Sequence, residues 1–307
     1  MNKIAFIFPG QGSQSLGMLA KFADHAELKN TFAQASEVLG LDLWDLTQNG
    51  PEAKLNETEF TQPAILTASI ALWRIWQNEK GEAPSVLAGH SLGEYSALVA
   101  AQSLDFQDAV SLVSKRGQFM QAAVPEGVGA MAAVLGLSDE EVKAICVNAS
   151  EHEIVSAVNF NSPGQVVIAG HKYAVNRALD LIKQAGKRAI LLPVSVPSHC
   201  LLMKPAADKL EQALQNIIIK SPQIPVFNNT DVKCETNADA IKSALIKQLY
   251  MPVRWVETIQ AMSATCSIFV ECGPGKVLTG LNKRINSALT TYPICEPDLF
   301  NLAIGRQ

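Results

Sequence analysis

Residues 87–95 read L-A-G-H-S-L-G-E-Y and contain the pattern G-x-S-x-G, centred on Ser91. The short apolar run at residues 85–88 predicts a buried strand, and residues 94–101 predict the helix that follows. A serine between such a strand and helix is typical of a nucleophile elbow, a strained turn that exposes the hydroxyl. The bare pattern also arises by chance, and the alternative is a structural turn serine. The flanking strand and helix favour the nucleophile.

The composition is that of a globular protein with a large buried core. Of the 307 residues, 48% are hydrophobic and 18% charged, and the formal net charge is −4 without a long basic run. We therefore expect neither a nucleic-acid partner nor an anionic membrane surface. Six cysteines without a C-x-x-C pair, and no apolar run of membrane-spanning length, indicate a cytoplasmic protein with reduced thiols. No His, Cys or carboxylate cluster has metal-ligand spacing, so we expect no metal.

The chain opens with a β-rich apolar run at residues 3–8, which predicts a strand buried on both faces of a parallel sheet. The loop P-G-Q-G-S-Q, residues 9–14, fits neither the dinucleotide fingerprint nor a phosphate loop. Because this loop would lie at the carboxyl edge of the sheet, its backbone can face a crevice there. Gln11 is a candidate to offer its N–H, and an ordinary turn is an equal alternative.

Several helices are predicted before and after the elbow. The first two cover residues 17–30 and 31–39, and a third, apolar helix covers residues 61–78, with Thr61 as N-cap and Pro63 in its first turn.

The helix predicted over residues 105–121, with Asp105 as N-cap, carries an arginine on an apolar line. Steps of three or four residues align four of its side chains: Ala109, Val113, Arg116 and Met120. A buried arginine needs an anion, since an unpaired charge away from water is costly. Either a protein carboxylate or a substrate carboxylate would satisfy the planar guanidinium of Arg116.

Composition changes at V-P-E-G, residues 124–127, which we interpret as a hinge. Alternating strands and helices are predicted after it, at residues 128–135, 138–148, 153–160, 165–169, 172–185 and 188–194. The helix at 138–148 has capping-box spacing between Ser138 and Glu141. The β-α-β-β-α-β order is that of a ferredoxin-like unit, so we expect a small inserted domain over residues 125–199.

The remaining segments predict a larger α/β domain around a mostly parallel central sheet, similar to the α/β-hydrolase fold. It comprises residues 1–124 and 200–307. In its second part, strands are predicted at 226–228 and 267–271, and helices at 201–217, 238–249 and 276–285.

A serine nucleophile needs a base. The linker at residues 195–199 ends on His199, at the junction of the two predicted domains, where clefts tend to lie. His90 is adjacent to Ser91 and is expected to point away from the same site. The other three histidines fall in polar segments: His25, His152 and His171. His199 is therefore the best candidate base, and a loop histidine without chemistry is the alternative.

Eight motifs together carry a family resemblance. They are F-P-G-Q-G-S-Q (8–14), T-Q-P-A (61–64), G-H-S-L-G-E-Y-S-A-L (89–98), K-R-G (115–117), N-S-P-G-Q-V-V-I-A-G (161–170), P-V-S-V-P-S-H-C (193–200), Q-L-Y-M-P-V-R-W (248–255) and E-C-G-P-G-K (271–276). With these motifs the chain resembles, nearly end to end, the malonyl-CoA:acyl carrier protein transacylases of fatty acid synthesis, which are S-malonyltransferases.

The resemblance implies a ping-pong acyl transfer through a malonyl-serine ester. In it, Ser91 is the nucleophile and His199 the base, and Gln248 occupies the position that orients the histidine in place of a triad aspartate. Backbone N–H groups of Gln11 and Leu92 would hold the oxyanion.

The resemblance further implies that Arg116 clamps the free carboxylate of the malonyl group, and we place Met120 beside it as a substrate-binding residue. The acceptor would be the phosphopantetheine thiol of an acidic acyl carrier protein. Coenzyme A would enter and leave as part of the substrate, so no bound cofactor is implied, and we expect a monomer. Lys187 and Arg188 could meet the carrier protein or a CoA phosphate, or could be solvated surface charges.

Three other functions remain open. An acyltransferase of a polyketide or polyunsaturated-lipid pathway is the nearest alternative. A serine esterase or thioesterase is disfavoured by the inserted domain and by the absence of an evident acidic third member. A non-catalytic subunit is disfavoured because Ser91, His199 and Arg116 occur together.

Overall fold

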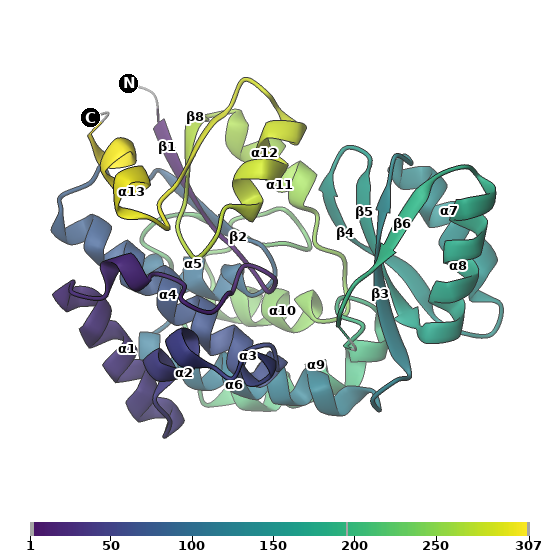
Figure 1. Ribbon diagram of the computed structural model, residues 1–307, viewed down its shortest axis with the longest axis horizontal. Coiled ribbons are helices and arrows are strands. Elements are labelled where there is room, and N and C mark those ends of the chain that lie inside the picture. The colour runs from purple at the N-terminus through teal and green to yellow at the C-terminus, as the bar shows by residue number, and fades with distance from the viewer. Residues whose placement is uncertain (1–2, 195, 306–307) are drawn as a thin grey trace.

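A five-stranded parallel sheet, in the order β7-β2-β1-β8-β9, lies at the centre of the larger lobe of this computed structural model (Figure 1). The structure describes residues 3–194 and 196–305. The strands of this sheet are β1 (Lys3–Phe8), β2 (Val86–Gly89), β7 (Val226–Phe227), β8 (Cys266–Glu271) and β9 (Thr290–Pro293). The predicted central parallel sheet is confirmed, and the elbow strand β2 pairs directly with β1.

Side chains of β1 alternate between two hydrophobic cores because successive residues of a strand point to opposite faces. Ile4, Phe6 and Phe8 belong to the larger core, whereas Ala5 and Ile7 belong to a second core. The larger core packs under helices including α1 (Ala26–Leu39), α4 (Thr58–Asn78), α5 (Gly93–Ala100), α6 (Phe106–Ala123) and α9 (Lys204–Gln215). The second packs under α11 (Trp255–Ser263) and α12 (Val277–Ile285). The sheet is therefore covered on both faces.

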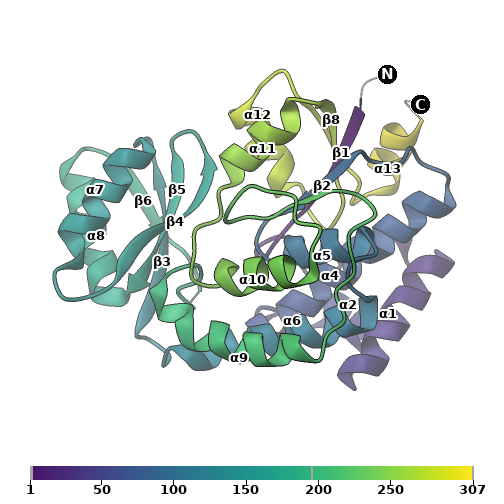
Figure 2. The ribbon, with the colours of Figure 1, turned by 180° about the vertical axis from the view of Figure 1, so that it is seen from behind.

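Shorter elements complete the larger lobe. They are η1 (Ala20–Phe22), α2 (Leu43–Asn49), α3 (Glu52–Leu55), η2 (Leu201–Met203), α10 (Ala238–Gln248) and α13 (Pro297–Ile304). Seen from behind, α9 runs along the lower edge of the larger lobe from its junction with the smaller lobe, and α10 lies above it (Figure 2). None of the helices within residues 3–194 and 196–305 is long and apolar enough to cross a membrane.

Two helix predictions near the N-terminus are wrong in their boundaries. The two helices predicted to meet at Thr31 are one helix, α1, which begins after His25, whose ring nitrogen accepts the Glu27 N–H at 3.2 Å. The next long helix, α4, begins at Thr58, so Thr61 is not its N-cap and Pro63 lies in its second turn. The Thr61 hydroxyl instead donates to the carbonyl of Leu55 at 2.5 Å, which ties α4 to the end of α3.

The smaller lobe contains a four-stranded antiparallel sheet in the order β4-β5-β3-β6. Its elements follow one another as β3 (Gly129–Leu135), α7 (Asp139–Ser150), β4 (Val155–Ser162), β5 (Gln165–His171), α8 (Lys172–Gln184) and β6 (Arg188–Leu191). The two helices cover one face of this sheet (Figure 1). The expected capping box at the start of α7, between Ser138 and Glu141, is confirmed.

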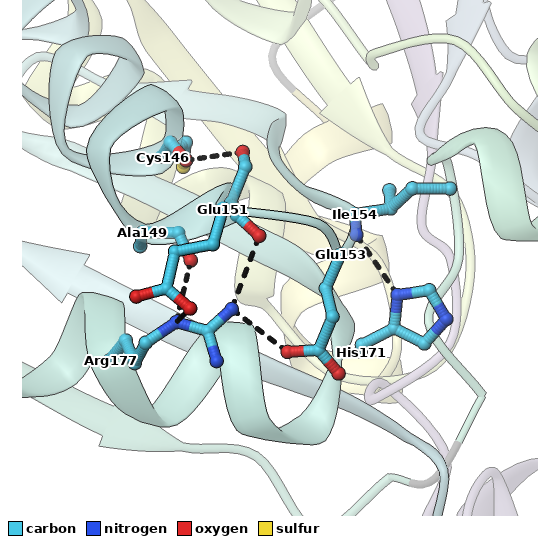
Figure 3. A network of polar contacts seen from close by, with 8 residues as sticks. Cys146, Ala149, Glu151, Glu153, Ile154, His171 and Arg177 are labelled. Atoms are coloured by element: carbon cyan, nitrogen blue, oxygen red, sulfur yellow. Dashed lines mark hydrogen bonds and ion pairs between the residues drawn. The ribbon is translucent and has the colours of Figure 1, made fainter.

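Arg177 on α8 anchors the end of α7 and the start of β4 (Figure 3). Its Nε donates to the carbonyl of Ala149 at 2.9 Å, and its Nη2 lies 2.8 Å from the carboxylate of Glu153. Beside it, the Nδ1 atom of His171 accepts the N–H of Ile154 at 2.9 Å. His171 therefore has a structural partner within the smaller lobe.

The two lobes are joined by backbone pairing as well as by their connecting segments. The N–H of Phe160 on β4 donates to the carbonyl of Val253 at 3.0 Å, and the N–H of Val253 donates to the carbonyl of Val158 at 2.8 Å. These bonds hold one edge of the small sheet against the segment that leads into α11. Ser195, which we assigned to the linker ending on His199, lies outside the described residues.

Candidate active site

Ser91 occupies a strained turn between β2 and α5, with φ at 51°. A non-glycine residue rarely adopts this left-handed region. The two flanking glycines are required by close backbone approach: a Cβ at Gly89 would lie 1.8 Å from the carbonyl carbon of Gly93. A Cβ at Gly93 would lie 2.0 Å from the carbonyl oxygen of Phe8. The sequence pattern thus has the local geometry of a nucleophile elbow.

His199 lies opposite this serine, with Nε2 2.8 Å from the Ser91 Oγ atom. Its Nδ1 atom lies 2.6 Å from the backbone carbonyl oxygen of Gln248. Because a carbonyl only accepts hydrogen bonds, Nδ1 carries the proton and Nε2 offers a lone pair to the serine hydroxyl. His199 is 3% exposed, and its main-chain N–H donates a hydrogen bond to the carbonyl of Leu249 at 2.9 Å. The structure therefore brings the candidate nucleophile and base together.

Gln248 contacts the histidine through its backbone, and its side chain has separate partners. The amide Nε2 donates to the carbonyl of Ser91 at 3.0 Å and to Oε2 of Glu94 at 2.8 Å. The amide Oε1 accepts from the Nη2 of Arg116 at 3.1 Å. The acceptor for His199 is therefore the main-chain carbonyl of residue 248, and the glutamine side chain is not needed for it.

Arg116 is 1% exposed and reaches the nucleophile from α6. Its Nη1 donates to the Oε1 of Gln62 at 2.8 Å, and its Nη2 lies 3.4 Å from the Ser91 Oγ. Within the described residues, no carboxylate forms an ion pair with Arg116, and its Nε has no hydrogen-bond acceptor. No protein carboxylate from the part of the chain that the structure describes thus satisfies Arg116 directly. A buried cation without a direct ion pair favours an anionic ligand in the adjoining cavity.

This cavity lies between the two lobes and opens beside Ser91. Its lining from the larger lobe includes Gln11, Leu92, Arg116 and Met120, all of which were predicted to belong to the site. The smaller lobe and its linker contribute an apolar wall: Met131, Val167, Leu192, Val194 and Val196. No hydrogen bond from the backbone N–H of Gln11 or Leu92 is found within the described residues. Both N–H groups thus remain available to a ligand.

Met120 reaches the cavity next to Gln62, whose Nε2 lies 3.5 Å from the methionine sulfur. Sequence reasoning missed Gln62, although it stands inside the T-Q-P-A motif quoted above. From α4, its amide contacts both the sulfur of Met120 and the guanidinium of Arg116 on α6.

The expectation that His90 points away from the site is wrong. His90 is among the residues that line the same cavity as Ser91, and its Nε2 lies 2.8 Å from the Oδ1 of Asn161, another lining residue, on β4. The turn at Ser91 reverses the chain, so adjacent residues can face one cavity. Because its ring is bound to Asn161 rather than to Ser91, His90 does not replace His199 as the base.

Burial dominates the electrostatics of the site. It lowers the pKa of His199 to about 3, together with the positive charge of Arg116, which contributes less. Burial also lowers the pKa of Arg116 and raises that of Glu94 to about 7. The imidazole is therefore neutral and able to accept a proton at neutral pH. Among the described residues, no group of three or more His, Cys, Asp or Glu side chains is placed to hold a metal ion.

Comparison with known proteins places this geometry in context. The sequence model of the acyl transferase domain family matches residues 5–289 of this chain. The chain is 59% identical over 307 residues to the malonyl CoA-acyl carrier protein transacylase of Escherichia coli K12, covering 99% of each chain. It is 46% identical to the protein of the same name from Bacillus subtilis 168, covering 99% of this chain and 97% of that one.

Solved structures of malonyl transacylases are also similar to this chain. The malonyl CoA-acyl carrier protein transacylase from Coxiella burnetii superposes with a TM-score of 0.98 at 51% identity, covering 99% of this chain and 98% of that one. A malonyl-transacylase solved in complex with its type II polyketide acyl-carrier protein has a TM-score of 0.98 at 54% identity, covering 99% of this chain and 100% of that one.

Proposed function

The chain belongs to the acyl transferase domain family, and on that premise we propose that it transfers a malonyl group from malonyl-CoA to acyl carrier protein. The observation that carries this proposal is the meeting of Ser91 and Arg116. A buried guanidinium that forms no ion pair with a carboxylate of the described residues lies 3.4 Å from the nucleophilic oxygen. An acyl group that bears a second, free carboxylate would place that anion beside Arg116 while its thioester carbonyl meets Ser91.

We propose that the transfer proceeds in two halves through a serine ester. In the first half, Nε2 of His199 takes the hydroxyl proton as the Ser91 Oγ attacks the thioester carbonyl. The oxyanion of the tetrahedral intermediate accepts hydrogen bonds from the N–H groups of Gln11 and Leu92, each typically worth about 3 kcal/mol of barrier lowering. The C–S bond then breaks, and His199 returns the proton to the leaving thiolate of CoA.

In the second half, the pantetheine thiol of the carrier protein gives its proton to His199 and attacks the malonyl-serine carbonyl. Collapse of the second intermediate breaks the C–Oγ bond, and the imidazolium reprotonates Ser91. The neutral carbonyl of Gln248 holds the ring in position throughout, and it stabilises the imidazolium less than a carboxylate would. The apolar wall from the smaller lobe limits the access of water, which favours transfer over hydrolysis.

The carrier protein has two candidate classes. A carrier protein of fatty acid synthesis is the first, as the resemblance of the sequence motifs to the transacylases of that pathway implies. A polyketide carrier protein is the second, because a malonyl-transacylase 54% identical to this chain was solved with such a partner.

We further propose that residues 125–199 form an inserted ferredoxin-like domain, and that residues 1–124 and 200–307 form an α/β-hydrolase-like domain. The order of elements in the smaller lobe and its antiparallel strand order support this division. A cytoplasmic monomer without a tightly bound cofactor stays a prediction.

The experiment that tests the function is intact-protein mass spectrometry after brief mixing with malonyl-CoA, followed by addition of either class of carrier protein. We expect a malonyl adduct that maps to Ser91, persists in buffer and moves to the carrier protein, and we expect none in Ser91→Ala. Acetyl-CoA is the matched donor control and should acylate more slowly. An adduct lost equally fast without carrier protein would contradict a transferase and indicate a hydrolase.

A further inference from the structure

A buried carboxyl group lies directly under the nucleophile turn and has no step in the mechanism above. Glu94 is in the first turn of α5 and is 2% exposed. Its Oε2 accepts the backbone N–H of Asn229 at 3.0 Å and the side-chain Nε2 of Gln248 at 2.8 Å. No ion pair to Glu94 is found within residues 3–194 and 196–305. A buried carboxyl group is costly, so its position calls for a role.

The two residues that Glu94 holds are the two that hold Ser91. The Oδ1 of Asn229 accepts the N–H of Ser91 at 2.7 Å, and its Nδ2 donates to the carbonyl of Gly89 at 2.6 Å. The Nε2 of Gln248 donates to the carbonyl of Ser91 at 3.0 Å. The Ser91 N–H is therefore held by the side chain of Asn229, whose main-chain N–H Glu94 binds. The Ser91 carbonyl is held by the side chain of Gln248, which Glu94 also binds, and by the main-chain N–H of Glu94 at 3.0 Å. A residue in a sparsely populated conformation persists only when its surroundings over-determine it.

Glu94 also sets the direction of the Gln248 amide. The NH₂ end must face the acceptor oxygen of Glu94, and this leaves the carbonyl end facing the Nη2 of Arg116 at 3.1 Å. The reverse orientation would place a donor against the guanidinium. The Gln248 amide thus connects the carboxylate of Glu94 to the guanidinium of Arg116. Its donor end faces the negative group and its acceptor end faces the positive group.

We propose that Glu94 is a positioning residue for this active site. Through Asn229 and Gln248 it holds the Ser91 turn, and through the Gln248 amide it acts as an indirect counter-ion that competes with the acyl carboxylate for Arg116. The second part rests on the proposed malonyl transfer.

The charges around Glu94 determine how this competition depends on pH. Arg116 faces it from α6 and Tyr95 neighbours it on α5. Asp231 lies after β7, with its carboxylate 3.9 Å from the ammonium of Lys247 on α10. Burial raises the pKa of Glu94 to about 7, and the charge of Arg116 opposes that rise. Glu94 therefore becomes ionised as the pH rises through about 7, and its charge then weakens the attraction of Arg116 for a second carboxylate.

Two variants separate the hydrogen bonds from the charge. Glu94→Gln keeps a carbonyl oxygen for Asn229 and Gln248 but has no charge, whereas Glu94→Ala loses both. The measurement is the rate of Ser91 acylation against donor concentration, from about pH 6 to pH 8 around the Glu94 pKa. It uses malonyl-CoA and, as matched control with the same CoA portion, acetyl-CoA.

In the wild type we expect KM for malonyl-CoA, relative to acetyl-CoA, to rise with pH across this window. In Glu94→Gln that relative rise should vanish while kcat stays within about threefold of wild type for both donors. Glu94→Ala should lower kcat for both donors by about 10- to 100-fold, because the nucleophile is misplaced.

Four outcomes overturn parts or all of the proposal. A Glu94→Ala protein that acylates at wild-type rates refutes positioning. A Glu94→Gln protein that retains the malonyl-specific pH dependence refutes the counter-ion. If Glu94→Ala does not fold, kcat of Glu94→Gln decides the positioning part, because a loss well beyond threefold for both donors would refute positioning through the hydrogen bonds that glutamine keeps. Failure of the wild type to form a malonyl adduct refutes the proposed function instead, which the mass measurement above detects separately.

Discussion

The Nδ1 atom of His199 lies 2.6 Å from the backbone carbonyl oxygen of Gln248. The ring is thus oriented by a neutral group that belongs to the main chain at the end of α10 and that no substitution at position 248 removes. The side chain of the same residue connects Ser91, Glu94 and Arg116. One residue therefore contributes to both the base and the carboxylate site, through separate groups that mutagenesis can distinguish.

Gln248→Ala should reduce the acylation rate less than His199→Ala does. The alanine keeps the carbonyl that orients the ring, so we expect a loss of about tenfold, whereas loss of the base should cost roughly 10³-fold or more. Single-turnover acylation by malonyl-CoA measures both. Gln118→Ala, which removes an exposed amide on α6 bonded to Glu59, is the matched control and should leave the rate unchanged. If Gln248→Ala were as damaging as His199→Ala, the orienting role assigned to the backbone carbonyl would be wrong.

Arg116→Ala should relax the preference for malonyl over acetyl donors. A charge-assisted hydrogen bond contributes about 1.5–3 kcal/mol, so KM for malonyl-CoA should rise by roughly 10- to 100-fold. Because the guanidinium also lies 3.4 Å from the Ser91 Oγ, kcat can change for both donors, and the informative quantity is the ratio of kcat/KM values. An equal loss for both donors would show that Arg116 does not read the acyl carboxylate.

Protonation of His199 should not limit acylation between pH 8 and pH 5. The imidazole must be neutral to accept the serine proton, and burial and Arg116 lower its pKa to about 3, so the competent form prevails above that pH. A histidine with an ordinary pKa near 6.5 would lose roughly 30-fold at pH 5. The profile is best measured in Glu94→Gln, which removes the titration of Glu94. An inflection near pH 6.5 in that variant would contradict the buried, neutral base.

Much of this site could be predicted because its key features are local in sequence. The elbow around Ser91, the N-cap Asp105 and the capping box of α7 each involve residues within four positions of one another, and each is confirmed. The line that includes Arg116 follows from helical periodicity alone, and its members are buried. The family motifs then indicated which distant residues would join them.

The missed features depend on contacts that sequence spacing does not encode. Asn229 reaches Ser91 across 138 positions, and Gln62 reaches Arg116 across 54. The acceptor for His199 is a main-chain carbonyl oxygen. Every residue type has this atom, so no residue in the sequence indicates the acceptor. The boundary predicted at Thr31 failed because α1 continues through it, with the Thr31 hydroxyl bonded to the carbonyl of Glu27 at 2.7 Å.

The glycines of the elbow give a stability prediction with an internal control. In Gly93→Ala, the new Cβ would lie 2.0 Å from the carbonyl oxygen of Phe8, a main-chain atom of the central strand that cannot move without disturbing the sheet. We expect a loss of about 3 kcal/mol or more and a lower Tm, together with loss of acylation as Ser91 shifts. Gly280→Ala is the control, because this helical position in α12 has open space around its Cβ and should gain up to about 1 kcal/mol.

Thermal unfolding and Ser91 acylation, measured on both variants, separate a general glycine effect from contact at the elbow. Strain at the elbow predicts that only Gly93→Ala loses Tm and activity together. A stable and active Gly93→Ala protein would mean that β1 and α5 can separate without cost. The close approach of α5 to the end of β1 would then not be what holds Ser91 in its left-handed conformation. The hydrogen bonds of its backbone with Asn229, Gln248 and the Glu94 N–H would have to hold it instead.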